Sequence, residues 1–232
     1  MTATSALRTS LREQLETLLG EPPPAAYTDA LLERVDAGSG VELLRLRPRS
    51  FDDVREAQAL LGPGRPTPYW ASAWPSGYAL LRAVTAAGSL AGRRVLELGC
   101  GLGMPSVAAA RAGAEVLASD AAPEAVVYAA HNLAVNDVRG EVAVADWGDL
   151  ADLGPWDLVI GADVLYTKAN AASLARLLPR LVAPRGEALI ADPGRAGCAE
   201  FLTLTRSTWE RTSTPDGPDV EVHRLTSRRE RA

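Results

Sequence analysis

Three glycines in alternate positions, Gly99, Gly101 and Gly103, are the sequence feature that most constrains the fold. They follow a short apolar run at residues 95–98, and Pro105, a residue type favoured in the first turn of a helix, comes soon after them. Glycine has no Cβ, so a ligand can approach the backbone of a strand–turn–helix connection closely. The sequence therefore predicts a ligand site at this turn, and a nucleotide-like ligand is the hypothesis.

Short apolar runs alternate with helical segments after residue 94. Continuous apolar runs separated by helices are typical of a parallel sheet that is covered on both faces. One of the helices is expected to begin at Pro123 and to end near Asn136. We expect an α/β, Rossmann-like doubly wound sheet. Its predicted strands are residues 95–98, 116–119, 142–145, 158–161 and 188–191.

The N-terminal part has a different character. Leucines recur at helical spacing between residues 7 and 19, and Gly20 with the prolines after it ends this predicted helix. An apolar run at 30–35, a possible strand at 41–46 and a Pro/Gly-rich passage at 62–68 follow. We interpret residues 1–68 as an N-terminal helical accessory layer packed on a core domain that comprises residues 69–232.

The C-terminal part predicts a hairpin. Two β-rich runs, residues 207–214 and 220–227, flank the turn-rich tetrapeptide that begins at Pro215. We expect these runs to form an antiparallel pair that completes the core domain.

Composition excludes several classes of function. The formal net charge of -5 argues against nucleic acid as a substrate, because affinity for a phosphate backbone comes largely from clustered Lys and Arg. Cys100 and Cys198 lie far apart, and no clustered Cys/His or carboxylate ligand set accompanies His131 or His223, so we expect no metal site. No apolar run reaches the length of a signal peptide or a membrane span, so we expect a soluble, cytoplasmic protein.

The spacing around the glycine turn separates two kinds of nucleotide ligand. A dinucleotide fingerprint beginning at Gly99 needs Gly or Ala where Met104 stands, so NAD(P) and an oxidoreductase are disfavoured. Asp120 ends the second predicted strand, where a carboxylate can accept both hydrogen bonds of a ribose diol.

Glu97-x-Gly99-x-Gly101-x-Gly103 resembles motif I of the class I S-adenosylmethionine-dependent methyltransferases. The resemblance implies that the acidic residue orients the turn and the methionine amino group of the donor. It also implies that the turn contacts the donor and that residues after the third strand contact adenine. The residues expected at the donor by this resemblance also include Cys100, Asp146, Trp147 and Ala162.

The residues after the fourth predicted strand are candidates for the chemistry. Methyl transfer from a sulfonium is an in-line displacement that depends mainly on positioning. Asp163 is expected to hold an acceptor amine and accept its proton, and Tyr166 offers a hydroxyl and a ring wall. The alternative is that Asp163 only caps the next helix. An (Asn/Asp)-Pro-Pro-(Tyr/Phe) sequence, which marks many nucleobase methyltransferases here, is absent.

Asp163-x-x-Tyr166, together with the Tyr-Trp-Ala-x-x-Trp-Pro-x-Gly stretch at 69–77, resembles the family-16 type of seven-β-strand protein lysine methyltransferases. The stretch and residues 191–195 look like the branch that acts on the electron transfer flavoprotein β-subunit, with similarity over about residues 66–226. The resemblance implies that Trp70, Trp74 and Gly77 cover the donor and that Asp192 and Arg195 line the acceptor entrance.

The acceptor stays open at this point. The expected partner is a protein, such as an electron transfer flavoprotein β-subunit or a ribosomal protein, or a small-molecule amine. The leading hypothesis is a protein lysine N-methyltransferase. Its alternatives are a small-molecule N- or O-methyltransferase and a non-catalytic adaptor that binds S-adenosylmethionine, because one fold hosts many functions.

Overall fold

The computed structural model describes residues 3–62 and 65–228, so residues 63–64 of the expected Pro/Gly-rich passage lie outside it. Seven strands form the main sheet, in the order β5-β4-β3-β6-β7-β9-β8. Only β9 runs antiparallel to the others, and it pairs with β7 and β8. The strands are β3 (Arg94–Leu98), β4 (Glu115–Asp120), β5 (Glu141–Val144), β6 (Trp156–Ala162), β7 (Val182–Asp192), β8 (Trp209–Asp216) and β9 (Val220–Ser227).

This order confirms the doubly wound sheet and the C-terminal hairpin that the sequence predicts. The chain leaves β3 toward β4 and β5 and then returns to the other side of β3 with β6, so the strand order reverses between β3 and β6. Ligands of such sheets bind at the carboxyl ends of the strands beside this reversal. The fold thus places the predicted ligand turn after β3 at the expected edge.

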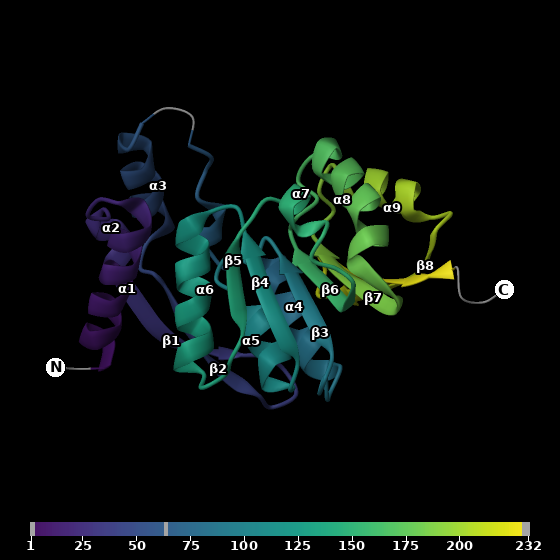
Figure 1. The fold of residues 1–232 in the computed structure, drawn as a ribbon, viewed down its shortest axis with the longest axis horizontal. Coiled ribbons are helices and arrows are strands. Elements are labelled where there is room, and N and C mark those ends of the chain that lie inside the picture. Colours follow the sequence, from purple (N-terminus) through teal and green to yellow (C-terminus); the bar gives the residue numbers. More distant parts are fainter. Residues whose placement is uncertain (1–2, 63–64, 229–232) are drawn as a thin grey trace.

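Helices cover both faces of the sheet. Side chains alternate between the faces, so Leu158 and Ile160 pack on the side of α4 and α5, whereas Val159 packs on the side of α8 and α9. Figure 1 shows α8 and α9 in front of the strands and α4 and α5 behind them. The helices of the core are α4 (Pro75–Ala86), α5 (Met104–Arg111), α6 (Pro123–Val135), α7 (Trp147–Leu150), α8 (Lys168–Leu181) and α9 (Cys198–Thr205).

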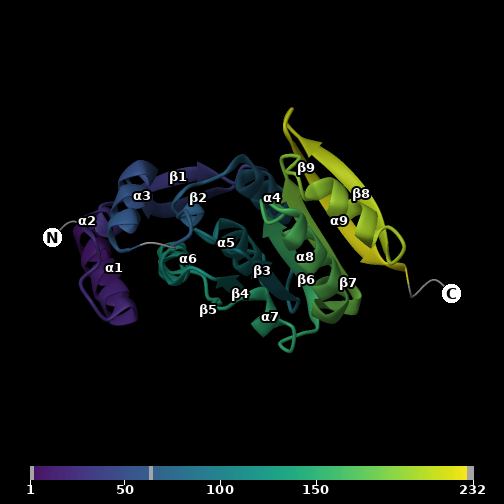
Figure 2. The same ribbon diagram turned by 90° about the horizontal axis from the view of Figure 1, so that it is seen from above.

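The N-terminal region contains strands as well as helices. The possible strand at 41–46 is present as β2 (Glu42–Pro48), and the apolar run at 30–35 is its antiparallel partner β1 (Ala30–Asp36). In Figure 2 these two strands lie above α6 and extend toward α4. The remaining elements are α1 (Ala3–Leu19), α2 (Ala25–Thr28), α3 (Phe51–Leu60) and a 3-10 turn, η1 (Tyr69–Ala71). The expected helical layer is therefore a mixed one.

Two asparagines attach β2 to the core. The Asn132 amide accepts a hydrogen bond from the Leu46 N–H and donates to the Leu46 carbonyl at 3.0 Å. One helical turn later, Asn136 makes the same pair of bonds with the backbone of Leu44. Asn132 also donates to the Leu102 carbonyl at 2.8 Å, so one buried side chain connects β2, α6 and the glycine turn. Among the described helices, none has the length and apolar character needed to cross a membrane.

Candidate functional site

A cleft of about 960 Å³ lies at the carboxyl ends of β3, β4 and β6. Its size is at the upper end of the range for small-molecule sites. Most of the residues singled out in the sequence line this cleft, although they are spread over more than 120 positions of the chain. They are Trp70, Trp74, Gly77, Glu97, Gly99, Cys100, Gly101, Gly103, Asp120, Ala162, Asp163, Tyr166 and Arg195.

The glycine turn is shaped by positive φ angles and close packing. Gly101 has φ +51°, and a Cβ there would lie 3.6 Å from the backbone of Trp70. Gly103 has φ +69°, and its Cβ would lie 2.8 Å from the Cβ of Ala129 in α6, which real structures do not tolerate. Glycine is thus required for the torsion angle and, at Gly103, for helix packing. The turn presents bare backbone to the cleft.

Glu97 lies beneath the turn and is 2% exposed. One of its carboxyl oxygens accepts hydrogen bonds from the Ser106 backbone N–H at 2.9 Å and from the Ser106 hydroxyl. Burial raises the pKa of Glu97 to about 8, although the Ser106 hydrogen bonds act in the opposite direction. The group therefore holds a proton at neutral pH in the absence of a cation.

Asp120 ends β4 and supports the turn. Its two carboxyl oxygens accept hydrogen bonds from the Gly101 N–H and the Ala122 N–H, both at 2.9 Å. Burial raises the pKa of Asp120, against the effect of these backbone bonds. A carboxylate oxygen has two lone pairs, so Asp120 retains acceptor capacity toward the cleft. Cys100 is buried, which raises the pKa of its thiol well above the ordinary value, and the charges of Asp120 and Glu97 act in the same direction.

Aromatic side chains form a wall of the cleft. The Trp70 ring is buried and packs between Tyr27 and Tyr128, with centroids 6.0 Å and 5.5 Å away. The Trp74 indole N–H donates to the Tyr69 carbonyl at 2.8 Å, and the two rings meet edge-on. The sequence left open whether these tryptophans pack the core or line the ligand site. Trp70 packs in the core and also lines the cleft, whereas Trp74 is partly exposed, contacts Phe51 and Tyr69, and lines the cleft.

Asp163 and Arg195 form an ion pair at the other end of the cleft. The Arg195 Nε is 2.6 Å from one carboxylate oxygen, and a terminal nitrogen is 3.1 Å from the other. Asp163 has φ +58°, a left-handed conformation that Asp tolerates better than most residues. It does not cap α8, because that cap is the Thr167 hydroxyl, which accepts from the Asn170 N–H. Tyr166 is 57% exposed at the cleft mouth.

Asp192 does not line the cleft but supports a residue that does. It ends β7 with 1% exposure, and its carboxylate accepts a hydrogen bond from the Arg195 N–H at 2.7 Å. Burial raises the pKa of Asp192, as does the nearby charge of Asp163. Within the described part of the chain, its other oxygen has no hydrogen-bond partner. Its contact with the acceptor entrance is therefore indirect.

Asp146 and Trp147 are not brought into the cleft. Asp146 is exposed and begins α7, where its backbone N–H donates to the Asp149 carboxylate at 3.2 Å. The Trp147 ring packs against the core on the α8 side. The position of these two residues does not support their predicted contact with adenine, which stays a prediction.

The sequence missed several lining residues from the N-terminal region. Arg45, Gln58 and Arg65 precede the proposed domain boundary at residue 68, yet they line the cleft. Arg65 lies 3.6 Å from Glu124 at the start of α6. No local motif marks these side chains, because only the packing of the accessory layer on α6 brings them to the site.

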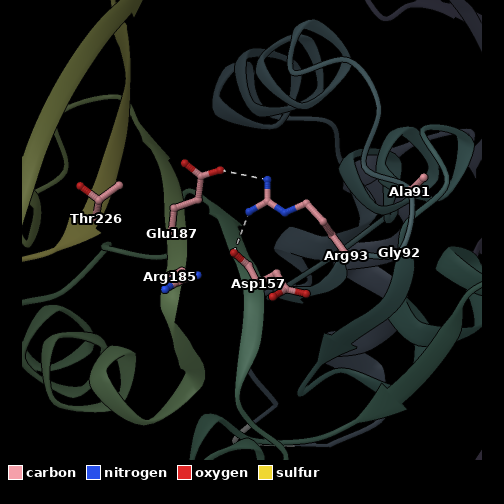
Figure 3. Close-up of a pocket in the computed structure, with 7 residues that line it drawn as sticks. All are labelled: Ala91, Gly92, Arg93, Asp157, Arg185, Glu187 and Thr226. Carbon is pink, nitrogen blue, oxygen red and sulfur yellow. Dashed lines mark hydrogen bonds and ion pairs between the residues drawn. The ribbon is translucent and has the colours of Figure 1, made fainter. Parts of the chain in front are cut away.

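A second hollow, of about 530 Å³, lies at the amino ends of β3 and β6. Figure 3 shows Arg93 reaching across it to the Asp157 carbonyl at 2.8 Å and the Glu187 carboxylate at 3.2 Å. These bonds tie neighbouring segments together at the end of the sheet remote from the glycine turn. Over residues 3–62 and 65–228, no group of three or more His, Cys, Asp or Glu side chains is placed to hold a metal ion.

Comparison with known proteins places this geometry in a family. A family model described as lysine methyltransferase matches residues 67–204, which include the glycine turn, Asp163 and Arg195. The chain belongs to this family. The resemblance inferred from the motifs is thereby confirmed.

Similarity to individual proteins is more limited in extent. The electron transfer flavoprotein beta subunit lysine methyltransferase of Danio rerio is 38% identical over 134 residues, 56% of this chain and 52% of that protein. A ubiquinone biosynthesis O-methyltransferase of Xanthomonas oryzae pv. oryzae is 32% identical over 136 residues, 58% of this chain and 57% of that protein. The chain thus spans about half the length of these curated relatives.

A solved structure supports the fold. The 16S rRNA N2 G1207 methyltransferase of T. thermophilus, in complex with AdoMet and guanosine, has a TM-score of 0.63 and 18% identity. The match covers 86% of this chain and 50% of that one. At this identity the likeness concerns the arrangement of strands and helices only.

Proposed function

We propose that this protein is an S-adenosylmethionine-dependent protein lysine N-methyltransferase. One observation carries the proposal: a cleft in a chain of the lysine methyltransferase family joins the glycine turn to the Asp163–Tyr166 segment. The turn suits a donor, and the segment suits an amine.

The residues at one end of the cleft fit S-adenosylmethionine. The turn presents bare backbone to the cleft, Asp120 has acceptor capacity for a ribose diol, and Glu97 is a carboxyl group ready to pair with the methionine ammonium. When bound, S-adenosylmethionine supplies a methyl group on a positively charged sulfur. The Trp70 and Trp74 rings line the same cleft.

The other end fits an acceptor amine. A lysine amine attacks the methyl carbon only after losing its proton, and the carbon–sulfur bond breaks as the nitrogen–carbon bond forms. Asp163 is placed to hold the amine and take up the proton, while the Tyr166 ring and hydroxyl border its path. Rate enhancement then comes mainly from alignment of nitrogen, carbon and sulfur.

The acceptor is proposed to be a protein, with an electron transfer flavoprotein β-subunit or a ribosomal protein as candidates. The 38% identity to a methyltransferase named for the former supports that choice. The exposed position of Tyr166 at the cleft mouth suits an acceptor larger than the cleft. We place the reaction in the cytoplasm as part of the same proposal.

A small-molecule acceptor is the second candidate, and the ubiquinone biosynthesis relative favours it. Incubation of the protein with labelled donor and a lysate separates the two. The lysate comes from cells that lack the enzyme. Discrete labelled protein bands support the proposal, and label confined to small metabolites contradicts it. Lys168 is the one lysine of this sequence, so Lys168→Arg removes labelling of the enzyme itself.

Asp163→Asn tests the role of the carboxylate. We expect protein labelling to fall roughly 100-fold or more, because the amide can neither pair with the amine nor accept its proton. Calorimetry should show that affinity for S-adenosylhomocysteine is retained. Asp216→Asn is the matched control, since Asp216 is paired in the same two-bond manner with Arg82 outside the cleft. Unchanged labelling by Asp163→Asn would contradict the role of this carboxylate, whereas donor binding by the wild type without labelling of any acceptor would favour the non-catalytic adaptor.

A further inference from the structure

The Arg195 guanidinium is bonded to the Asp163 carboxylate, which is the group proposed to bind the acceptor amine. It bonds both oxygens of Asp163, whose side chain is 13% exposed, while the Arg195 side chain is 43% exposed. Two parallel bonds of this kind are the strongest geometry for an arginine and a carboxylate. An incoming ammonium must therefore compete with a cation that is already in place.

The position of Arg195 is fixed by its loop. The Arg195 N–H donates to Asp192, and the Gly197 N–H donates to the Leu165 carbonyl at 3.1 Å. A Cβ on Gly197 would lie 2.4 Å from the Thr167 carbonyl, so the two segments are in direct contact. The backbone of Arg195 is thus attached to the Asp163–Tyr166 segment, and only its side chain is free to turn toward solvent.

The three arginines that line the cleft each have a carboxylate partner before any ligand arrives. Arg195 pairs with Asp163, Arg65 with Glu124, and Arg45 with Glu33, which Arg47 also contacts. A sulfonium donor and a lysine ammonium would add two positive charges close together. An uncompensated charge in a partly desolvated site is costly.

The rim nearby carries a further positive charge. Lys168 begins α8, directly after Thr167, which touches the Arg195 loop. It is exposed, and no ion pair with it occurs among residues 3–62 and 65–228. Arg195 and Lys168 thus place two positive charges close to the Asp163–Tyr166 segment, where they would attract an acidic group of an acceptor.

We propose that Arg195 holds Asp163 in the acceptor-free enzyme and moves to a carboxylate of the acceptor when the target lysine binds. This rests on the proposed function and makes it more specific: the preferred acceptor is a lysine with an Asp or Glu beside it. When Arg195 exchanges Asp163 for a carboxylate of the acceptor, its guanidinium still has a carboxylate partner. Asp163 then becomes available to bind the lysine ammonium. A lysine without such a neighbour leaves Arg195 competing for Asp163.

The first experiment maps the lysines that the wild-type enzyme methylates in the lysate with labelled donor, using mass spectrometry. We expect an Asp or Glu within reach of each principal site. If the mapped lysines lack acidic neighbours, the exchange of partners is wrong while the lysine methyltransferase function stands. If the wild-type enzyme labels no lysine, both are wrong.

The second experiment measures coupling between Arg195 and the acceptor carboxylate. Replacing that acidic residue of a mapped acceptor by its amide should lower kcat/KM about tenfold with the wild-type enzyme and less than about twofold with Arg195→Gln. The loss should be in KM for the acceptor. Equal losses with both enzymes would overturn the proposal.

Arg82→Gln serves as the matched control for this cycle. Arg82 is also 43% exposed and bonds both oxygens of Asp216, at 3.0 Å and 2.9 Å, but it does not line the cleft. It should behave as the wild type with both acceptors. A purely structural role of Arg195 predicts a lower kcat with both acceptors and no loss of charge preference, and that result would also contradict the proposal.

Discussion

At the scale of single residues, burial decides the charge of the group beneath the glycine turn. Glu97 has almost no contact with water, and this raises its pKa to about 8. The motif marks Glu97 as a ligand residue, but its protonation follows from the packing around it. Local hydrogen bonding likewise decides the position of Asp146. It places this residue at the start of α7, so its predicted contact with adenine lacks support.

Proton release on donor binding follows from the raised pKa of Glu97. At pH 7 the free carboxyl is mostly protonated, and an adjacent methionine ammonium lowers its pKa and favours the charged form. Binding of S-adenosylhomocysteine should therefore release close to one proton at pH 7 and much less at pH 9, where the group is already ionised. Calorimetry in buffers of different ionisation enthalpy measures this number.

Glu97→Gln is the control for this proton. The variant should bind S-adenosylhomocysteine about tenfold or more weakly, because a hydrogen bond to a charged group is lost, and its binding heat should be independent of the buffer. Buffer-independent heat with the wild type at pH 7 would contradict the assignment of Glu97 to the ammonium.

At the scale of elements, α6 connects the accessory layer to the ligand turn. Its place in the core is predictable, since it begins at Pro123 and ends before Asn136 as the sequence indicates. Its side chains also bind the backbone of β2, which the sequence does not reveal. The sequence likewise indicates β1 only as an apolar run, because a short run of this kind fits either a strand or a buried helix segment.

Asn132→Ala should destabilise the fold and weaken the donor site together. It leaves the buried Leu46 and Leu102 backbone groups without partners, at a cost of roughly 2–4 kcal/mol in the free energy of unfolding. Affinity for S-adenosylhomocysteine should fall as the turn loosens. Denaturant unfolding and calorimetry measure the two effects.

Asn136→Ala provides the comparison, because Asn136 bonds β2 but not the glycine turn. It should lower stability while leaving donor affinity unchanged. If both variants weaken donor binding equally, Asn132 acts through the general attachment of β2 rather than through its bond to Leu102.

At the scale of the whole molecule, the cleft is built by segments from both sides of the proposed boundary at residue 68. Arg45, Gln58 and Arg65 meet the core residues of the glycine turn in one cavity. A ligand that fills the cavity therefore stabilises the accessory layer and the sheet together, since it binds only when both are folded.

Thermal unfolding should report this linkage. At about 100 times its Kd, S-adenosylhomocysteine should add about 2.7 kcal/mol to the free energy of unfolding, which raises Tm by roughly 5–10 °C for a chain of this size. The same concentration of NAD should leave Tm unchanged, because Met104 stands where the dinucleotide pattern needs a small residue. A comparable shift with NAD would revive the oxidoreductase hypothesis.

The sequence by itself determined the strands of the main sheet and the glycine turn, because apolar periodicity and glycine torsions are properties of short segments. Only the tertiary structure decided that Arg195 pairs with Asp163, 32 positions away, and that residues before 68 line the cleft. Those contacts arise where β6, β7 and the accessory layer pack together. Their charge and burial depend on neighbours that no local pattern specifies.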